Sequence, residues 1–77
     1  MLSLNLFVII DNYVSLMPSV NISGNVKLEN GVYVGTGAQI LQGLTIGENT
    51  TIGAGSVVTK NIPMVSIAVG NPCKIII

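Results

Sequence analysis

The chain has 77 residues, with three basic and three acidic side chains and no histidine, so its formal net charge at pH 7 is zero. A chain without a basic surface is not a nucleic-acid-binding protein. Its hydrophobic fraction of 49% is high, but the longest apolar run, Leu6 to Ile10, is far shorter than the roughly 20 residues of a membrane-spanning helix. The start of the chain lacks the basic segment of a secretion signal, and the single Cys73 excludes an internal disulfide framework.

An aliphatic side chain recurs at every sixth position through most of the chain. A period of six differs from the period of 2 in a strand and 3.6 in a helix, and it indicates short strands joined by regular corners in a parallel β-helix. Nine hexads between residues 4 and 57 predict three triangular coils. Residues 1–9 form an atypical N-terminal segment in the repeat register, and residues 10–63 form the predicted β-helix. The repeating positions are Leu4, Ile10, Leu16, Ile22, Leu28, Val34, Ile40, Ile46, Ile52 and Val58.

Small and polar residues stand where the corners of this β-helix must fall. Glycine, asparagine and aspartate tolerate the left-handed backbone region at little steric cost, so their first role is structural. The predicted corners contain Asp11, Asn12, Gly24, Asn25, Asn30, Gly31, Gly35, Gly37, Gly47, Asn49, Gly53 and Gly55.

The hexad pattern degrades after Val58, and residues 64–77 are predicted to form a cap that includes the Gly70-Asn71-Pro72-Cys73-Lys74 motif. Proline lacks an amide donor and interrupts an interior strand ladder, so this segment is suited to fold over the last coil. Residues 75–77 are predicted to form a short strand.

Three segments, residues 18–26, 52–60 and 69–74, resemble the C-terminal half of sugar O- and N-acyltransferases. This group contains sialic acid O-acetyltransferases and bacillosamine N-acetyltransferases, and the Ile52-Gly53-Ala54-Gly55 and Gly70-Asn71-Pro72 elements are common to the wider hexapeptide acyltransferase superfamily. The resemblance implies an all-β fold, a left-handed parallel β-helix of about three coils with a short cap, which departs from the usual right-handed crossover. It also implies a homotrimer.

Members of this family bind acetyl-CoA in the groove between neighbouring solenoids, so the resemblance implies the same co-substrate here. Carried over position by position, the contacts fall at Ser15, Thr36 and Ala54. Ser15 departs from the family, where a histidine is common.

Five further residues are implied as cofactor contacts, each with an alternative role. Gly35, Gly53 and Gly55 keep the groove open or simply turn corners. Lys60 and Lys74 suit the phosphates of the cofactor because an ammonium is a compact point charge, or they are solvated surface lysines.

Acetyl transfer requires a base that removes a proton from the acceptor, normally a histidine in this family. By the resemblance, the catalytic position and its acidic neighbour fall near Leu6 and Phe7, neither of which transfers protons. Asp11 is a weak base unless it is buried, and Cys73 has no base beside it. No catalytic residue is therefore assigned, and whether the chain is an enzyme stays open.

Two functions follow. The first is transfer of an acetyl group from acetyl-CoA to a hydroxyl or amine of a sugar, either a nucleotide sugar or sialic acid, by a truncated or base-lacking form of the enzyme. The alternative is a non-catalytic trimeric scaffold. A carbonic anhydrase of the same fold would need a histidine-bound zinc, so no metal is expected. The expected location is the cytoplasm, where acetyl-CoA is available and a free cysteine is ordinary.

Overall fold

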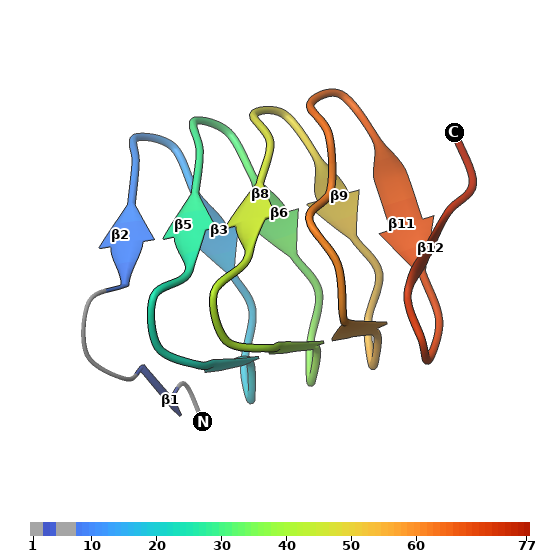
Figure 1. Cartoon of the computed structure of the whole chain (residues 1–77), viewed down its shortest axis with the longest axis horizontal. Coiled ribbons are helices and arrows are strands. Elements are labelled where there is room, and N and C mark those ends of the chain that lie inside the picture. Colours follow the sequence, from blue (N-terminus) through green and yellow to red (C-terminus); the bar gives the residue numbers. More distant parts are fainter. Residues whose placement is uncertain (1–2, 5–7) are drawn as a thin grey trace.

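The chain is a left-handed parallel β-helix, as the period of six and the resemblance predicted (Figure 1). The structure is a computed structural model, and it describes residues 3–4 and 8–77, with side chains from residue 8 onward. The described residues form strands and turns and contain no helix. The strands are β1 (Ser3–Leu4), β2 (Ile9–Ile10), β3 (Ser15–Leu16), β4 (Asn21–Ile22), β5 (Lys27–Leu28), β6 (Tyr33–Val34), β7 (Gln39–Ile40), β8 (Thr45–Ile46), β9 (Thr51–Ile52), β10 (Val57–Val58), β11 (Ile67–Val69) and β12 (Lys74–Ile75).

Three sheets form the sides of the solenoid, with strand orders β1-β4-β7-β10, β2-β5-β8 and β12-β11-β9-β6-β3. Through the first three coils each strand pairs in parallel with the strand three hexads later, as in Ile10 with Leu28 and Leu28 with Ile46. Three hexads therefore make one coil, and equivalent residues of successive coils stack along the axis.

The side chain at each repeat position points into the solenoid, and the residue before it points out. Leu28, Ile46 and Ile52 are fully buried, whereas their preceding residues Lys27, Thr45 and Thr51 are partly exposed. This alternation follows from the period of two in a strand. Small or aliphatic residues four places after each repeat position, such as Val26, Val32 and Ala38, complete the core.

The corners contain a left-handed residue at every sixth position. The series comprises Tyr13, Ser19, Asn25, Gly31, Gly37, Gly43, Asn49 and Gly55, all with φ between 56° and 79°. Glycine and asparagine at five of the predicted corner positions are therefore explained by backbone conformation.

A fourth coil begins with β10 and is shorter than the others. Ile62 bridges to Ile46, and Ile67 of β11 pairs with Thr51, so partners in this coil are closer in sequence than partners in the earlier coils. This coil contains two residues fewer than each of the earlier coils, and Pro63 at its second corner has no amide hydrogen to donate.

Two buried hydroxyls fasten this short coil to the third one. Thr50 donates to the carbonyl oxygen of Pro63 at 2.9 Å and accepts from the Ser66 amide at 3.4 Å. Ser56 accepts from the Gly70 amide at 3.1 Å. Side chains thus bind backbone groups at the point where the regular stacking is interrupted.

The C-terminal residues fold back and pair with β11, so that β12 becomes the edge strand of the third sheet. β12 pairs with β11 in the antiparallel direction, with Ala68 opposite Ile75 and Val69 opposite Lys74. Beside it, the Cys73 amide donates to the Val57 carbonyl at 2.8 Å. The observed strand overlaps the predicted strand 75–77 at Ile75.

Candidate functional site

The corners that follow β3, β6 and β9 stack into one column on the surface. The Gly37 amide donates to the Pro18 carbonyl at 3.0 Å, and the Gly55 amide donates to the Thr36 carbonyl at 2.8 Å. Thr36 and Ala54, one coil apart, occupy equivalent positions, and both are exposed. The structure therefore brings these two predicted contacts together.

The glycines beside Thr36 and Ala54 are explained by the packing of one coil on the next. A Cβ added at Gly35 would lie 2.5 Å from the amide nitrogen and 2.9 Å from the Cα of Ala54, and one at Gly53 would lie 2.6 Å from a methyl carbon of Val69. Gly55 has φ +69° and open space around it. The first two glycines allow close stacking and the third turns the corner, and together they leave Thr36 and Ala54 facing solvent.

Ser15 lies outside this column. It begins β3 and stands in register with Tyr33, which in turn pairs with Thr51. The residue that stacks at the equivalent corner position of the first coil is Pro18, three hexads before Thr36. Pro18 could have been identified from the sequence, because it lies one coil before Thr36.

Lys60 and Lys74 meet at a cavity of about 290 Å³ at the C-terminal end of the solenoid. Lys60 comes from the corner after β10 and Lys74 from β12, and both are exposed. No acidic side chain lines this cavity. Its lining residues are Thr59, Lys60, Asn61, Ile62, Pro72, Cys73, Lys74 and Ile75.

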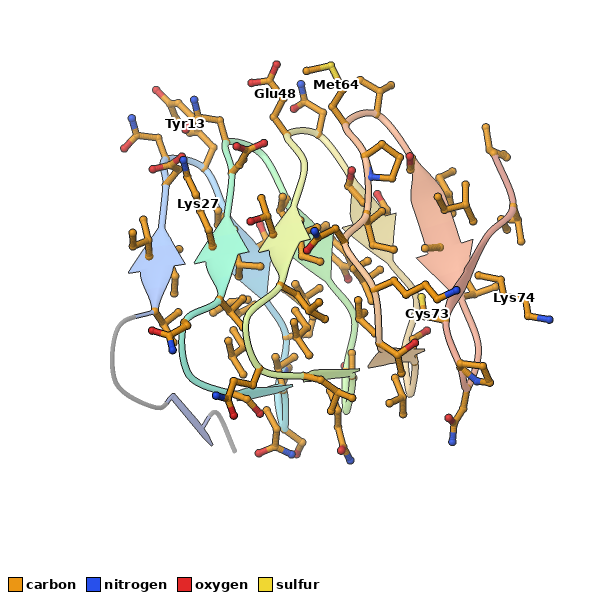
Figure 2. The ribbon with its side chains drawn as sticks, in the orientation of Figure 1. Tyr13, Lys27, Glu48, Met64, Cys73 and Lys74 are labelled. Atoms are coloured by element: carbon orange, nitrogen blue, oxygen red, sulfur yellow. The ribbon has the colours of Figure 1, made fainter. Side chains whose placement is uncertain are left out.

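Cys73 lies in the wall of this cavity and is half-buried (Figure 2). Burial raises the pKa of its thiol, and a hydrogen bond with Ser56 partly opposes that effect. The sequence has no histidine to remove the thiol proton. A protonated, half-buried thiol is a small apolar side chain rather than a nucleophile.

No proton-transfer group can be assigned in this site. The positions implied for the base and its acidic neighbour, Leu6 and Phe7, lie outside the described residues. Between residues 8 and 77, no group of three histidine, cysteine, aspartate or glutamate side chains is placed to hold a metal ion. The described part of the chain also contains no helix that is long and apolar enough to cross a bilayer.

The repeats match a known sequence family. Residues 25–60 match the bacterial transferase hexapeptide family (six repeats). A comparison with curated protein sequences gave no significant match.

Solved structures of acetyltransferases share the fold. PerB from Caulobacter crescentus, in complex with CoA and GDP-perosamine, is 34% identical with a TM-score of 0.87, over 88% of this chain and 33% of that one. The acetyltransferase domain of PglB from Neisseria gonorrhoeae, in complex with acetyl coenzyme A, is 35% identical with a TM-score of 0.88, over 90% of this chain and 34% of that one. Galactoside acetyltransferase in complex with coenzyme A is 35% identical with a TM-score of 0.87, over 91% of this chain and 44% of that one. This chain therefore spans between a third and a half of the length of these proteins.

Proposed function

Since this chain belongs to the hexapeptide-repeat acyltransferase superfamily through its repeats and its left-handed β-helix, we propose that it is the cofactor-binding part of a sugar acetyltransferase. The reaction transfers the acetyl group of acetyl-CoA to a hydroxyl or amine of a sugar or nucleotide sugar. The observation that carries the proposal is the exposed corner column of Thr36 and Ala54 in a fold shared with sugar acetyltransferases solved with coenzyme A.

The corner column provides a narrow surface for an extended ligand. Gly35 and Gly53 have no Cβ and therefore allow successive coils to pack closely. Thr36 and Ala54 beside them present small side chains and backbone groups on the surface. Gly55 completes the turn. We assign Thr36 and Ala54 as contacts of the pantetheine arm and Gly35, Gly53 and Gly55 as the cofactor-site residues that keep the groove open for it, whereas Ser15, in a different column, stays a separate prediction.

The lysine-lined cavity suits the phosphates of the cofactor. Lys60 and Lys74 line it and no acidic side chain does, and an ammonium is a common phosphate partner. Lys60 and Lys74 would hold these phosphates, and the bound cofactor would supply an activated acetyl thioester.

The chain does not contribute a histidine base, because its 77 residues contain none. A positioned base is worth roughly 10² to 10⁴ in rate. We therefore propose a protein that binds acetyl-CoA but has little transfer activity as this chain alone. We also propose that the protein is a homotrimer and that it is located in the cytoplasm, where acetyl-CoA is available.

Calorimetric titration of acetyl-CoA tests this function, after the oligomeric state has been determined by sedimentation. Saturable binding near one cofactor per subunit is expected, and the K60Q/K74Q variant should bind at least tenfold more weakly. The matched control is K27Q, since Lys27 faces Glu29 away from the cavity. Absence of binding up to millimolar acetyl-CoA contradicts the proposal.

The absence of histidine favours a second candidate, a non-catalytic trimeric scaffold. A trimer that binds no cofactor, and whose acetyl transfer to several sugar acceptors equals that of buffer, identifies the scaffold. Saturable cofactor binding excludes it.

A further inference from the structure

The two ends of the solenoid differ in their backbone hydrogen bonds. At the C-terminal end the third coil donates to the short coil, for instance from the Thr51 amide to the Ser66 carbonyl at 2.9 Å, and β12 then pairs with β11 in the antiparallel direction. At the opposite end, named here the open end, β2 and β3 are edge strands of their sheets. Figure 1 shows β2 and β12 at opposite ends of the molecule.

The open end presents backbone carbonyls rather than amides. Each coil donates its strand amides to carbonyls of the next coil, for instance from Ile9 to Val26 at 2.9 Å. No amide of the described residues donates to the equivalent carbonyls one coil earlier. A strand that pairs with this end must therefore supply amides. The carbonyls concerned belong to Val8, Ile10, Val14 and Leu16.

The inward side chains of the first coil are also less covered than their equivalents in later coils. Ile10 is 39% exposed, whereas Leu28 and Ile46 at the same position of the next two coils are 0% exposed. Val14 and Leu16 are likewise only partly buried. Since these side chains lie at core positions, a further coil stacked on the open end would bury them.

The composition of the first coil excludes other kinds of ligand. Asp11 is the only charged residue between residues 8 and 19, so the open end does not suit a strongly charged ligand. A helix uses its interior amides for its own hydrogen bonds and has none to donate to a row of carbonyls. An apolar segment in a β conformation satisfies both the carbonyls and the side chains.

A second copy of this chain does not match the open end. Two open ends that face each other would place carbonyls opposite carbonyls. The C-terminal end has already used strand amides, because Gly53 donates to the Ala68 carbonyl at 2.9 Å. On the outermost parallel strand, the Ile67 amide donates to the Ile77 carbonyl at 3.2 Å. The occupant is therefore a different segment with free strand amides.

We propose that the open end binds a hexapeptide-repeat coil of another polypeptide, which continues the parallel ladders onto β2 and β3. Amides of the bound coil donate to the four carbonyls named above, and its aliphatic residues cover Ile10, Val14 and Leu16. This contact adds a strand to the edge of each of two sheets. It goes beyond the proposed function, because the lysine-lined cavity is formed by residues 59–62 and 72–75.

Nuclear magnetic resonance titration of the isotopically labelled chain tests this binding. The probe is a synthetic peptide of residues 26–43, whose amides donate to the following coil within the chain. Saturable shifts confined to residues 8–19 are expected. The control peptide is methylated on the amide nitrogens of Lys27 and Tyr33, which donate in the chain at 2.9 Å. It should bind at least about tenfold more weakly, because two hydrogen bonds are lost.

Two neighbouring variants locate the contact on the chain. Ile10 occupies an inward position and Ile9 precedes it on β2. Ile10→Ala should weaken peptide binding at least about fivefold and Ile9→Ala less than about twofold, because only Ile10 is buried by the bound coil. Circular dichroism checks that both variants fold.

Four results would overturn the proposal. They are no shift up to millimolar peptide, equal binding of the two peptides, equal effects of the two variants, and shifts at residues 59–62 and 72–75 instead of 8–19. Shifts of residues 8–19 that appear on raising the protein concentration alone would assign the open end to a second copy, which also contradicts it. None of these results decides whether the chain binds acetyl-CoA, so the proposed function is tested separately.

Discussion

At the scale of single residues, the structure separates glycines that turn the chain from glycines that let coils approach. Gly37 and Gly55 have positive φ, whereas Gly35 and Gly53 do not and instead face the next coil. The sequence left a corner role and a cofactor role open for Gly35, Gly53 and Gly55, and the geometry provides a structural reason for each of them. Thr36 and Ala54 have no comparable structural reason.

Substituting Gly35 by alanine separates the stability role from the binding role. The new Cβ would lie 2.5 Å from the Ala54 amide nitrogen, so one coil must shift. The free energy of unfolding in urea should fall by about 1–3 kcal/mol. The control is Thr36→Ala, at the exposed neighbouring position, which should change stability by less than about 0.5 kcal/mol. Equal stability of the two variants would contradict the stacking role of Gly35.

The site was only partly predictable from individual residues. Thr36 and Ala54 are one coil apart, so their proximity follows from the period alone. Lys60 and Lys74 meet because β12 turns back on β11, and no repeat predicts that reversal. Ser15 was assigned from a resemblance, and its position beside Tyr33 shows that the assignment does not follow the spacing of one coil.

At the scale of elements, the repeat predicts ten of the strands and fails where the spacing changes. The aliphatic series predicts every strand from β1 to β10 because each one places the repeat residue at its second position. Ile62 and Ala68 take the equivalent inward positions of the fourth coil, but two residues are missing before Ile62. Because the series of aliphatic residues is interrupted by this shift of two residues, the period of six does not predict the position of β11.

The buried hydroxyl of Thr50 should be needed to hold the short coil. The Thr50→Val variant retains the shape of the side chain but leaves the Pro63 carbonyl and the Ser66 amide without this partner. The free energy of unfolding should fall by about 1–3 kcal/mol. Thr51→Val is the matched control, because Thr51 is the outward-facing neighbour on β9, and its effect should stay within about 0.5 kcal/mol. A Thr50→Val variant as stable as this control would refute the role of the hydroxyl.

At the scale of the whole molecule, the chain is small for a free-standing domain. A chain of this size buries only about 60% of its unfolded surface, and many large apolar side chains of the described residues remain exposed. Association of copies would bury part of that surface and stabilise each subunit.

Stability should therefore depend on protein concentration. For a trimer, the midpoint of thermal unfolding should rise by roughly 5–10 °C over a hundredfold increase in concentration, because association and folding are linked. Circular dichroism at several concentrations measures this shift. A midpoint that is the same at all concentrations would show that the subunit is stable by itself.

Stacked strands are separated by a constant offset of three hexads. The number of hexads in the sequence therefore determines the length of the solenoid. Each coil adds one strand to every sheet, and therefore about 4.8 Å to the long dimension. Whole coils inserted ahead of β7 leave Thr50, Ser56 and the short coil that their hydroxyls fasten intact at their own end. The distance between two groups attached to different coils can therefore be changed in steps of one coil, by choosing how many hexads separate their positions in the sequence.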